Sequence, residues 1–308
     1  MASEKCEINE KQELVKRLKK ETGAVILAHT YQSPEITDIA DIVGDSFALA
    51  SKCAALPEKK VVMCGVRFMA ESVKILAPEK EVLLPEPDAT CPMAEMITPE
   101  RVRRFKAEHP EAVVVAYINT TAALKAECDV CVTSASAVDI LRKVENKNIL
   151  FIPDINLGQF VQKQLPEKNF KLIQGGCPTH ARMSKRDVDR VRALHPNALL
   201  LVHPECTPDV TEGADYIGST TGIMNFAKNS DKKEFIIGTE NSIVSHLQYD
   251  CPEKKFYPLS KDCVCHNMRA TTLPEVLGCL RGEGEEIILS DYVMENARRC
   301  IDEMLRLG

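Results

Sequence analysis

Short apolar runs recur along the chain and predict buried strands. Three of them, Val25–Ala28, Val113–Ala116 and Leu199–Val202, are apolar at every position, so both faces of each strand should be covered by other elements. Two further strands are predicted after each of these. Their runs are Val61–Met63, Ile149–Ile152 and Phe235–Ile237, followed by Val82–Leu84, Phe170–Ile173 and Phe256–Leu259.

Amphipathic segments between the runs predict helices. In Thr98–Pro110 and Ser184–Pro196 the apolar residues recur at helical spacing, and Thr98 and Ser184 are suited to cap the first turn. Alternating helices and strands are typical of three-layer α/β units with parallel sheets. Helices are also expected at Ser46–Leu56, Ser134–Val144 and about Thr220–Asn229.

The pattern repeats three times along the chain. His29, Tyr117 and His203 follow the first runs and are separated by steps of 88 and 86 residues. Self-similarity at a fixed period indicates repeated structural units. The same two steps separate Ser46, Ser134 and Thr220.

We therefore predict an α/β protein of three similar three-layer α/β/α domains, related by pseudo-threefold symmetry, with the active site at the central interface. The domains are expected at residues 1–92, 93–179 and 180–266. Residues 267–308 contain "TLPEVLGCLRG", a strand-like "EEIILSD" and a final helix through Leu307. They fall outside the third repeat and should complete the first domain.

Composition narrows the functional classes. A chain of 308 residues with 44% hydrophobic residues can bury several cores, and its net charge of -6 disfavours nucleic acid as a partner. Its first residues are charged, and no apolar run is long enough to span a bilayer, so we expect a soluble, cytoplasmic protein without membrane contact. Its thirteen cysteines are then expected to be thiols or metal ligands.

Three cysteines stand at the ends of the repeats. Cys91, Cys177 and Cys265 lie in loops, and Cys91 and Cys265 keep the step of 174 residues that separates His29 from His203. Three thiolates are too few for a closed zinc site but suit a 4Fe-4S cluster in which one iron stays open as a Lewis acid. Cys263 is the alternative third ligand, and the step of 174 residues favours Cys265.

The other cysteines are expected to have mainly structural roles. "CDVC" (Cys128 and Cys131) has a redox or zinc spacing, but no second pair follows it. Cys206 follows the candidate site residues and is expected near the site without serving it. Small buried apolar roles are expected for Cys6, Cys53, Cys64, Cys279 and Cys300.

Polar residues at strand ends and helix starts predict an anion site. Hydroxyl groups and free N–H groups at helix starts bind carboxylates and phosphates, so three such starts would suit a small, multiply anionic ligand. Among these positions Glu205 is the one carboxylate and the natural general base, with Tyr31 as its acid counterpart. The full set is His29, Tyr31, Ser46, Tyr117, Asn119, Ser134, His203, Glu205 and Thr220.

Nine strings along the chain closely resemble the quinolinate synthase family. They are "AHTYQ", "GDSFALA", "TCPMA", "YINT", "CVTSASA", "GGCPTHARMS", "HPEC", "GSTTGI" and "CVCHNM", and the resemblance runs from about residue 10 to residue 305. The chain differs in Thr30, where the family often has asparagine, and in Cys263 and His266.

This resemblance implies an enzyme that condenses iminoaspartate with dihydroxyacetone phosphate to quinolinate, phosphate and water in NAD biosynthesis. It implies one 4Fe-4S cluster on Cys91, Cys177 and Cys265, catalytic roles for Tyr31, His203 and Glu205, and contact with the oxidase or dehydrogenase that supplies the imine. The substrate contacts that it implies are His29, Ser46, Tyr117, Ile118, Asn119, Ser134, His203, Pro204, Glu205 and Thr220.

Two other functional classes share part of this sequence pattern. A transferase of the diphthamide-synthesis type also resembles three repeats with three cysteines, but "YINT", "HPEC" and "GSTTG" disfavour it. A non-catalytic iron–sulfur sensor is disfavoured by the expected placement of Glu205 and Tyr31 beside the metal.

Overall fold

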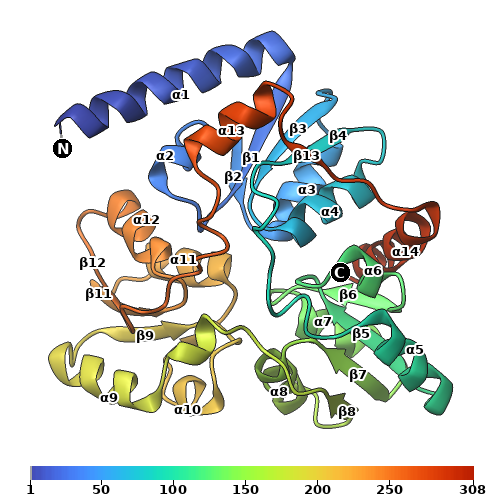
Figure 1. Cartoon of the computed structure of the whole chain (residues 1–308). Helices are drawn as coiled ribbons and strands as arrows, with labels where there is room; N and C mark the ends of the chain where they lie inside the picture. The colour runs from blue at the N-terminus through green and yellow to red at the C-terminus, as the bar shows by residue number, and fades with distance from the viewer. Residues whose placement is uncertain (1) are drawn as a thin grey trace. The chain divides into compact units, whose positions relative to one another are not determined.

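The computed structural model describes residues 2–308 and contains three sheets with helices between their strands (Figure 1). Each sheet has four parallel strands in the same order, in which the second strand of the repeat is at one edge, followed by the first, third and fourth. The first sheet has β1 (Ala24–His29), β2 (Ile42–Gly44), β3 (Lys60–Cys64) and β4 (Glu81–Leu84). The second has β5 (Val113–Tyr117), β6 (Val130–Val132), β7 (Asn148–Ile152) and β8 (Asn169–Leu172). The third has β9 (Leu199–Val202), β10 (Tyr216–Ile217), β11 (Glu234–Gly238) and β12 (Lys255–Pro258).

The helices also recur at equivalent places. A long helix precedes the first strand, a single-turn helix follows it, and longer helices follow the second and third strands. These sets are α1 (Ala2–Thr22), α5 (Pro99–Glu108) and α9 (Lys185–Leu194); α2 (Pro34–Thr37), α6 (Ala122–Lys125) and α10 (Pro208–Thr211); α3 (Ser46–Ala54), α7 (Ala137–Lys143) and α11 (Thr220–Asn229); and α4 (Arg67–Leu76), α8 (Ile155–Gln164) and α12 (Ser242–Asp250). Within residues 2–308, no helix combines the length and the apolar character that crossing a membrane requires.

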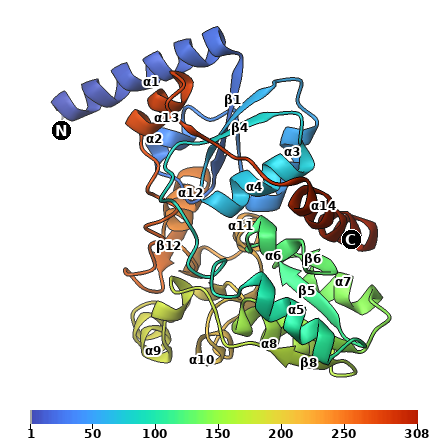
Figure 2. The same ribbon diagram turned by 45° about the vertical axis from the view of Figure 1, so that its right-hand side comes forward.

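The C-terminal segment adds to the first sheet. In both views α13 (Leu273–Leu280) lies along α1, and its apolar side chains share a core with Val15 of α1 and Ile26 of β1 (Figures 1 and 2). The two-residue strand β13 (Glu285–Glu286) pairs antiparallel with β4. The chain ends in α14 (Asp291–Leu307).

The described chain groups into two compact units. The first unit contains the chain up to Cys91, Thr121–Ala126 and His266–Arg298. The second contains Pro92–Thr120, Glu127–Cys265 and Arg299–Gly308. The three domain boundaries expected from the sequence stay a prediction.

The predicted strands are all present, but each repeat has one strand more than expected. The additional strands β2, β6 and β10 have three, three and two residues. Runs this short give no periodicity to recognise, and they hold their place by pairing with the first strand of the repeat.

One detail of the predicted helices was wrong, and a second was confirmed only in part. Helix α7 begins at Ala137 and not at Ser134, which lies in the preceding turn. Thr98 and Ser184 are the N-cap residues of α5 and α9, as predicted. Ser184 accepts the N–H of Asp187, whereas the side chain of Thr98 makes no capping bond and binds the carboxylate of Glu100.

One aspartate in each repeat fixes the first strand to the helix before it. Asp129 accepts the N–H of Val114 at 2.8 Å and forms an ion pair with Lys106 of α5 at 2.6 Å. The equivalent contacts are Asp41 with Ile26 and Lys19, and Asp215 with Leu200 and Arg192. Their spacing repeats the steps of 88 and 86 residues.

One buried lysine in each repeat binds the carbonyl groups at the end of a helix. Lys254 is 5% exposed, and its Nζ donates to the carbonyl oxygens of Ala227, Lys228 and Ser230 at 2.7, 2.8 and 2.8 Å. These groups have no partner within the helix, and a cation suits the negative end of its dipole. The equivalents are Lys80, which binds Leu56 and Glu58, and Lys168, which binds Val144 and Asn146.

We expect Lys254→Met to lower the free energy of unfolding by about 2–4 kcal/mol, because it leaves three carbonyl groups without their donor. Urea unfolding would measure the change. Lys228→Met is the matched control, since Lys228 forms a half-exposed ion pair with Asp250 whose loss should cost less than about 1 kcal/mol. Equal stability of Lys254→Met and the wild type would contradict the capping role.

Candidate active site

Side chains of the second unit meet at the carboxyl ends of parallel strands, where α/β sheets place their ligands. Tyr117 ends β5, Asp154 follows β7, and His203 and Glu205 follow β9. Thr239 follows β11.

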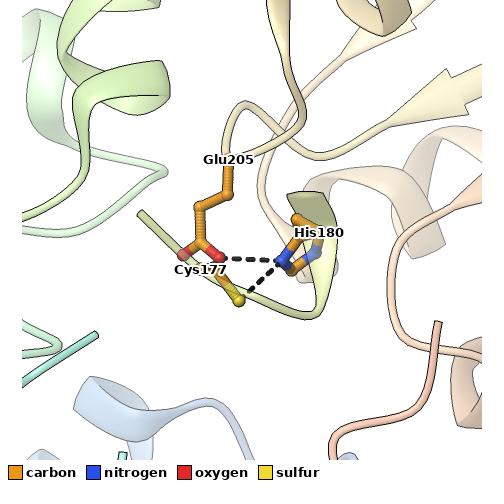
Figure 3. Close-up of side chains that lie close together, drawn as sticks. All are labelled: Cys177, His180 and Glu205. Atoms are coloured by element: carbon orange, nitrogen blue, oxygen red, sulfur yellow. Dashed lines mark hydrogen bonds and ion pairs between the residues drawn. The ribbon is translucent and has the colours of Figure 1, made fainter. Parts of the chain in front are cut away.

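Glu205 and His180 are buried and form a cluster with the half-buried Cys177 (Figure 3). His180 Nδ1 lies 2.8 Å from a carboxylate oxygen of Glu205 and 3.2 Å from the sulfur of Cys177. The ligand atoms of all three lie within 4.8 Å of one another, so the group can hold a metal ion. The hydroxyl of Tyr117 also binds the carboxylate of Glu205.

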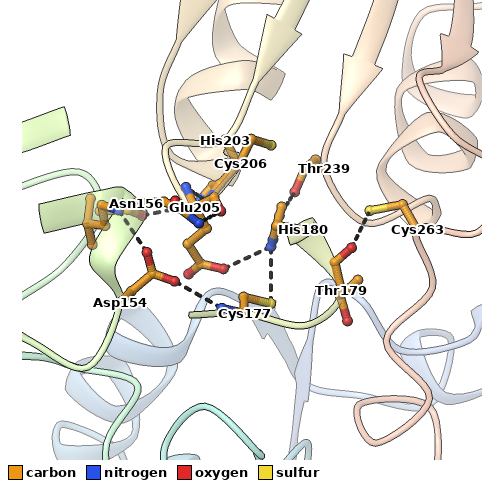
Figure 4. Close-up of polar contacts among 12 residues, drawn as sticks. Asp154, Asn156, Cys177, Thr179, His180, His203, Glu205, Cys206, Thr239 and Cys263 are labelled. Carbon is orange, nitrogen blue, oxygen red and sulfur yellow. Dashed lines mark hydrogen bonds and ion pairs between the residues drawn. The ribbon is translucent and has the colours of Figure 1, made fainter. Parts of the chain in front are cut away.

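The ring of His180 is fixed on both sides. Its Nε2 lies 3.0 Å from the hydroxyl of Thr239, and its face stacks on the ring of His203 with centroids 4.8 Å apart (Figure 4). His203 in turn places Nε2 3.3 Å from the hydroxyl of Ser134. A row of hydrogen-bonding side chains therefore runs from Thr239 through His180 to Glu205.

Asp154 positions the loop that carries Cys177. One carboxylate oxygen accepts the N–H of Leu157 at 2.7 Å and so caps α8, and the other accepts the N–H of Cys177 at 3.0 Å. Gly175 permits this close approach, because a Cβ there would lie 2.7 Å from the carbonyl oxygen of Pro153. Gly175 of "GGC" is thus explained by packing of the loop against Pro153, the residue that directly follows β7.

Opposing effects set the protonation of the two buried carboxyl groups. Burial raises the pKa of Glu205, but His180, His203 and the hydroxyl of Tyr117 lower it further, so Glu205 is ionised. Burial and the charge of Glu205 raise the pKa of Asp154 to about 7. One ionised carboxylate and one that titrates near neutrality therefore lie close to Cys177.

The two histidines at the strand ends are neutral. Burial lowers the pKa of both His29 and His203 to about 4. They can act as hydrogen-bond donors or acceptors at neutral pH without adding charge.

The first unit brings a second group of expected residues together. The rings of His29 and Tyr31 are edge to face with centroids 4.5 Å apart, and the N–H of Tyr31 donates to His29 Nδ1 at 3.0 Å. Ser46 is the first residue of α3, but the side chain that caps this helix belongs to Asp45. Thr220 likewise follows the capping residue, Ser219, at the start of α11 in the second unit.

The remaining expected contacts lie beside these groups. Ile118 and Asn119 follow Tyr117 after β5, where the N–H of Ile118 donates to the carbonyl oxygen of Val132 at 2.8 Å. Pro204 separates His203 from Glu205.

The cysteines differ in their exposure to solvent. Among the described residues, the three half-buried cysteines are Cys91, Cys177 and Cys265, and all three lie outside helices and strands. Cys263 is fully buried, its sulfur donates to the carbonyl oxygen of Thr179 at 3.7 Å, and burial raises the pKa of its thiol (Figure 4). Cys206 is also buried, with a raised pKa.

Cys6 and Cys131 differ in burial. Cys6 was expected to be buried but is exposed, because the apolar stripe of α1 consists of Ile8, Leu14, Val15 and Leu18. Cys131 of the "CDVC" pair is buried with its sulfur 3.1 Å from that of Cys300 in α14.

Sequence reasoning missed His180, Asp154 and Thr239. Register between the repeats could not find His180 or Thr239, because the site uses each of them in one repeat only. Asp154 does stand in register with a second carboxylate, Glu240, at the step of 86 residues. A usable signal was present for His180, which stands three residues after Cys177 in "GGCPTH".

Comparison with known proteins gives one consistent result. The family model described as quinolinate synthetase A protein matches residues 13–306. A quinolinate synthase of Caldicellulosiruptor bescii is 50% identical over 292 residues, which cover 95% of this chain and 96% of the relative. The quinolinate synthase of Alkaliphilus metalliredigens is 49% identical over 293 residues (95% and 97%), and that of Aquifex aeolicus is 47% identical over 309 residues (99% and 96%). On this near full-length similarity, the chain belongs to the quinolinate synthase family of enzymes.

Proposed function

We propose that the protein condenses iminoaspartate with dihydroxyacetone phosphate to quinolinate, phosphate and water in NAD biosynthesis. The observation that carries the proposal is the ionised Glu205, held by Tyr117 and His180 beside Cys177, in a chain of this family. The family match also favours this reaction over the transferase of the diphthamide-synthesis type. A cytoplasmic location and contact with the imine-supplying oxidase or dehydrogenase are parts of the same proposal.

We further propose that Cys91, Cys177 and Cys265 hold one 4Fe-4S cluster. A ligand thiol must be reachable yet sheltered, and these three half-buried loop cysteines have that exposure. Burial and the bond to Thr179 disfavour Cys263 as the third ligand. When bound, the cluster would supply an iron with an open position that acts as a Lewis acid toward a substrate hydroxyl group.

Glu205 and Tyr31 would carry out the proton transfers. Glu205 would accept protons, because it is ionised, and Tyr31 would donate them. A substrate group that displaced Tyr117 or His180 from Glu205 would raise the basicity of its carboxylate.

The neutral rings of His29 and His203 would donate hydrogen bonds to the substrate. His203 Nε2 lies 3.3 Å from the hydroxyl of Ser134, and this separation supports the proposal that the two side chains bind one anionic group. The carboxylate and phosphate groups would be bound by Ser46, Ser134, Asn119 and Thr220, together with the chain at Ile118 and Pro204.

The proposal can be tested by anaerobic purification, iron and sulfide analysis, and a quinolinate assay. We expect about four irons and four sulfides per chain. Quinolinate should form from dihydroxyacetone phosphate and freshly generated iminoaspartate, and omission of either substrate should abolish it. A fully loaded protein that forms no quinolinate would contradict the proposed reaction.

A further inference from the structure

We propose that Gln32 is a positioning residue, which holds the chain that follows Cys265 against the loop that carries His29 and Tyr31. This role rests on the proposed function, in which Cys265 is a cluster ligand and Tyr31 is a catalytic acid. Neither the sequence repeat nor the family comparison assigns a role to Gln32.

The amide of Gln32 joins two segments that are far apart in the sequence. Its side chain is completely buried, and Nε2 donates to the carbonyl oxygen of Met268, 236 residues along the chain. Both residues belong to the first unit. A buried bond of this kind is shielded from competition with water.

Gln32 is also part of the turn that presents the candidate acid. Its N–H donates to the carbonyl oxygen of His29 at 2.9 Å, and the N–H of Tyr31 donates to the ring of His29 at 3.0 Å. A shift of the Gln32 side chain would therefore be transmitted to the two residues before it.

The contact with Met268 limits where Cys265 can lie. Cys265 is three residues before Met268, and three residues of fully extended chain span at most about 11 Å. Cys265 therefore stays within that distance of Met268, the residue that Gln32 binds. The intervening segment is also folded, since the N–H of Arg269 donates to the carbonyl oxygen of His266 at 3.1 Å. This limit follows from the covalent chain alone.

A second anchor lies on the other side of Cys265. The guanidinium group of Arg182 donates to the carbonyl oxygens of Asp262 and Val264 at 3.3 Å each. Arg182 is exposed, whereas Gln32 is buried, so the bond made by Gln32 should be the more persistent of the two.

The choice of glutamine supports a role beyond packing. Its Oε1 is buried and has no hydrogen-bond partner among the described residues, which costs stability. Methionine would fill a similar volume without that cost. Glutamine at this position is therefore explained by the hydrogen bond that its amide group donates to the carbonyl oxygen of Met268.

The test compares Gln32→Met with Gln12→Met. Gln12 lies in the same unit and makes the same type of bond, from Nε2 to the carbonyl oxygen of Glu35 at 3.0 Å, but on the helix α2. We expect Gln32→Met to fold, to change the electron paramagnetic resonance spectrum of the reduced cluster, and to lower kcat at least about 10-fold with a smaller change in KM. Gln12→Met should match the wild type in both measurements.

Gln32→Glu has the same shape but replaces the donor by an acceptor, and should give the same spectral change. A wild-type spectrum and kcat in folded Gln32→Met would overturn the proposal. Failure of both Gln32 variants to fold would also overturn it, in favour of a purely structural role. The spectrum is recorded without substrate, so a loaded wild type that makes no quinolinate would overturn the proposed reaction while the comparison still decides the role of Gln32.

Discussion

Cys265→Ala should yield a folded protein that has lost the visible absorbance of an iron–sulfur cluster and forms no detectable quinolinate. Cys265 lies in a loop and is half-buried, so its replacement removes little from a core. Two remaining thiolates cannot hold a cluster that depends on three. Iron and sulfide content, absorbance and product formation measure the effect, and Cys91→Ala should behave in the same way.

Cys263→Ala is the matched control, two residues away. Cys263 belongs to the apolar core around β9 and β11, so its replacement should cost roughly 1 kcal/mol of stability while cluster content and quinolinate formation are retained. Loss of the cluster in Cys263→Ala and its retention in Cys265→Ala would reverse the assignment of the third ligand.

Glu205→Gln should lower kcat by about 10²–10⁴-fold, the usual effect of removing a general base, with the cluster content unchanged. Glutamine has nearly the same shape and can still accept one hydrogen bond from Tyr117 or His180, so the fold should persist. Steady-state kinetics on protein of known iron content would measure the loss.

Glu240→Gln removes another buried carboxylate from the same unit. Glu240 accepts hydrogen bonds from the N–H and hydroxyl groups of Ser242, so quinolinate formation should stay within about threefold of the wild type. Near-normal turnover by Glu205→Gln would exclude Glu205 as the base.

The strands of the fold could be predicted because parallel strands buried on both faces are apolar at every position. Val113–Ala116 and Leu199–Val202 are such runs, and β5 and β9 differ from them by at most one residue. The edge strand β10 has two half-buried residues, and no sequence pattern distinguishes so short a strand from a turn.

The candidate site could be predicted only where the repeats agree in sequence. His203 and Glu205 were found because His203 stands in register with His29 and Tyr117. His180 has no such register and Asp154 is in register with Glu240 alone, so their importance follows from distances to Cys177 that only the folded chain provides.

The helix starts were predicted less well, because several adjacent polar residues compete for one cap. Asp45 and Ser219 make the capping bonds next to Ser46 and Thr220. Either residue of each pair satisfies the sequence rule, and the backbone conformation decides between them.

The buried lysines have a consequence for how the protein tolerates movement. Each lysine and all the carbonyl groups that it binds come from one repeat, as for Lys254 with residues 227–230 and Lys168 with residues 144–146. The ion pairs of Asp129 and Asp215 are equally local. The free energy of these contacts is therefore independent of the orientation of one repeat relative to another. A change in that orientation would leave each of these charged groups with its hydrogen-bond or ion-pair partner.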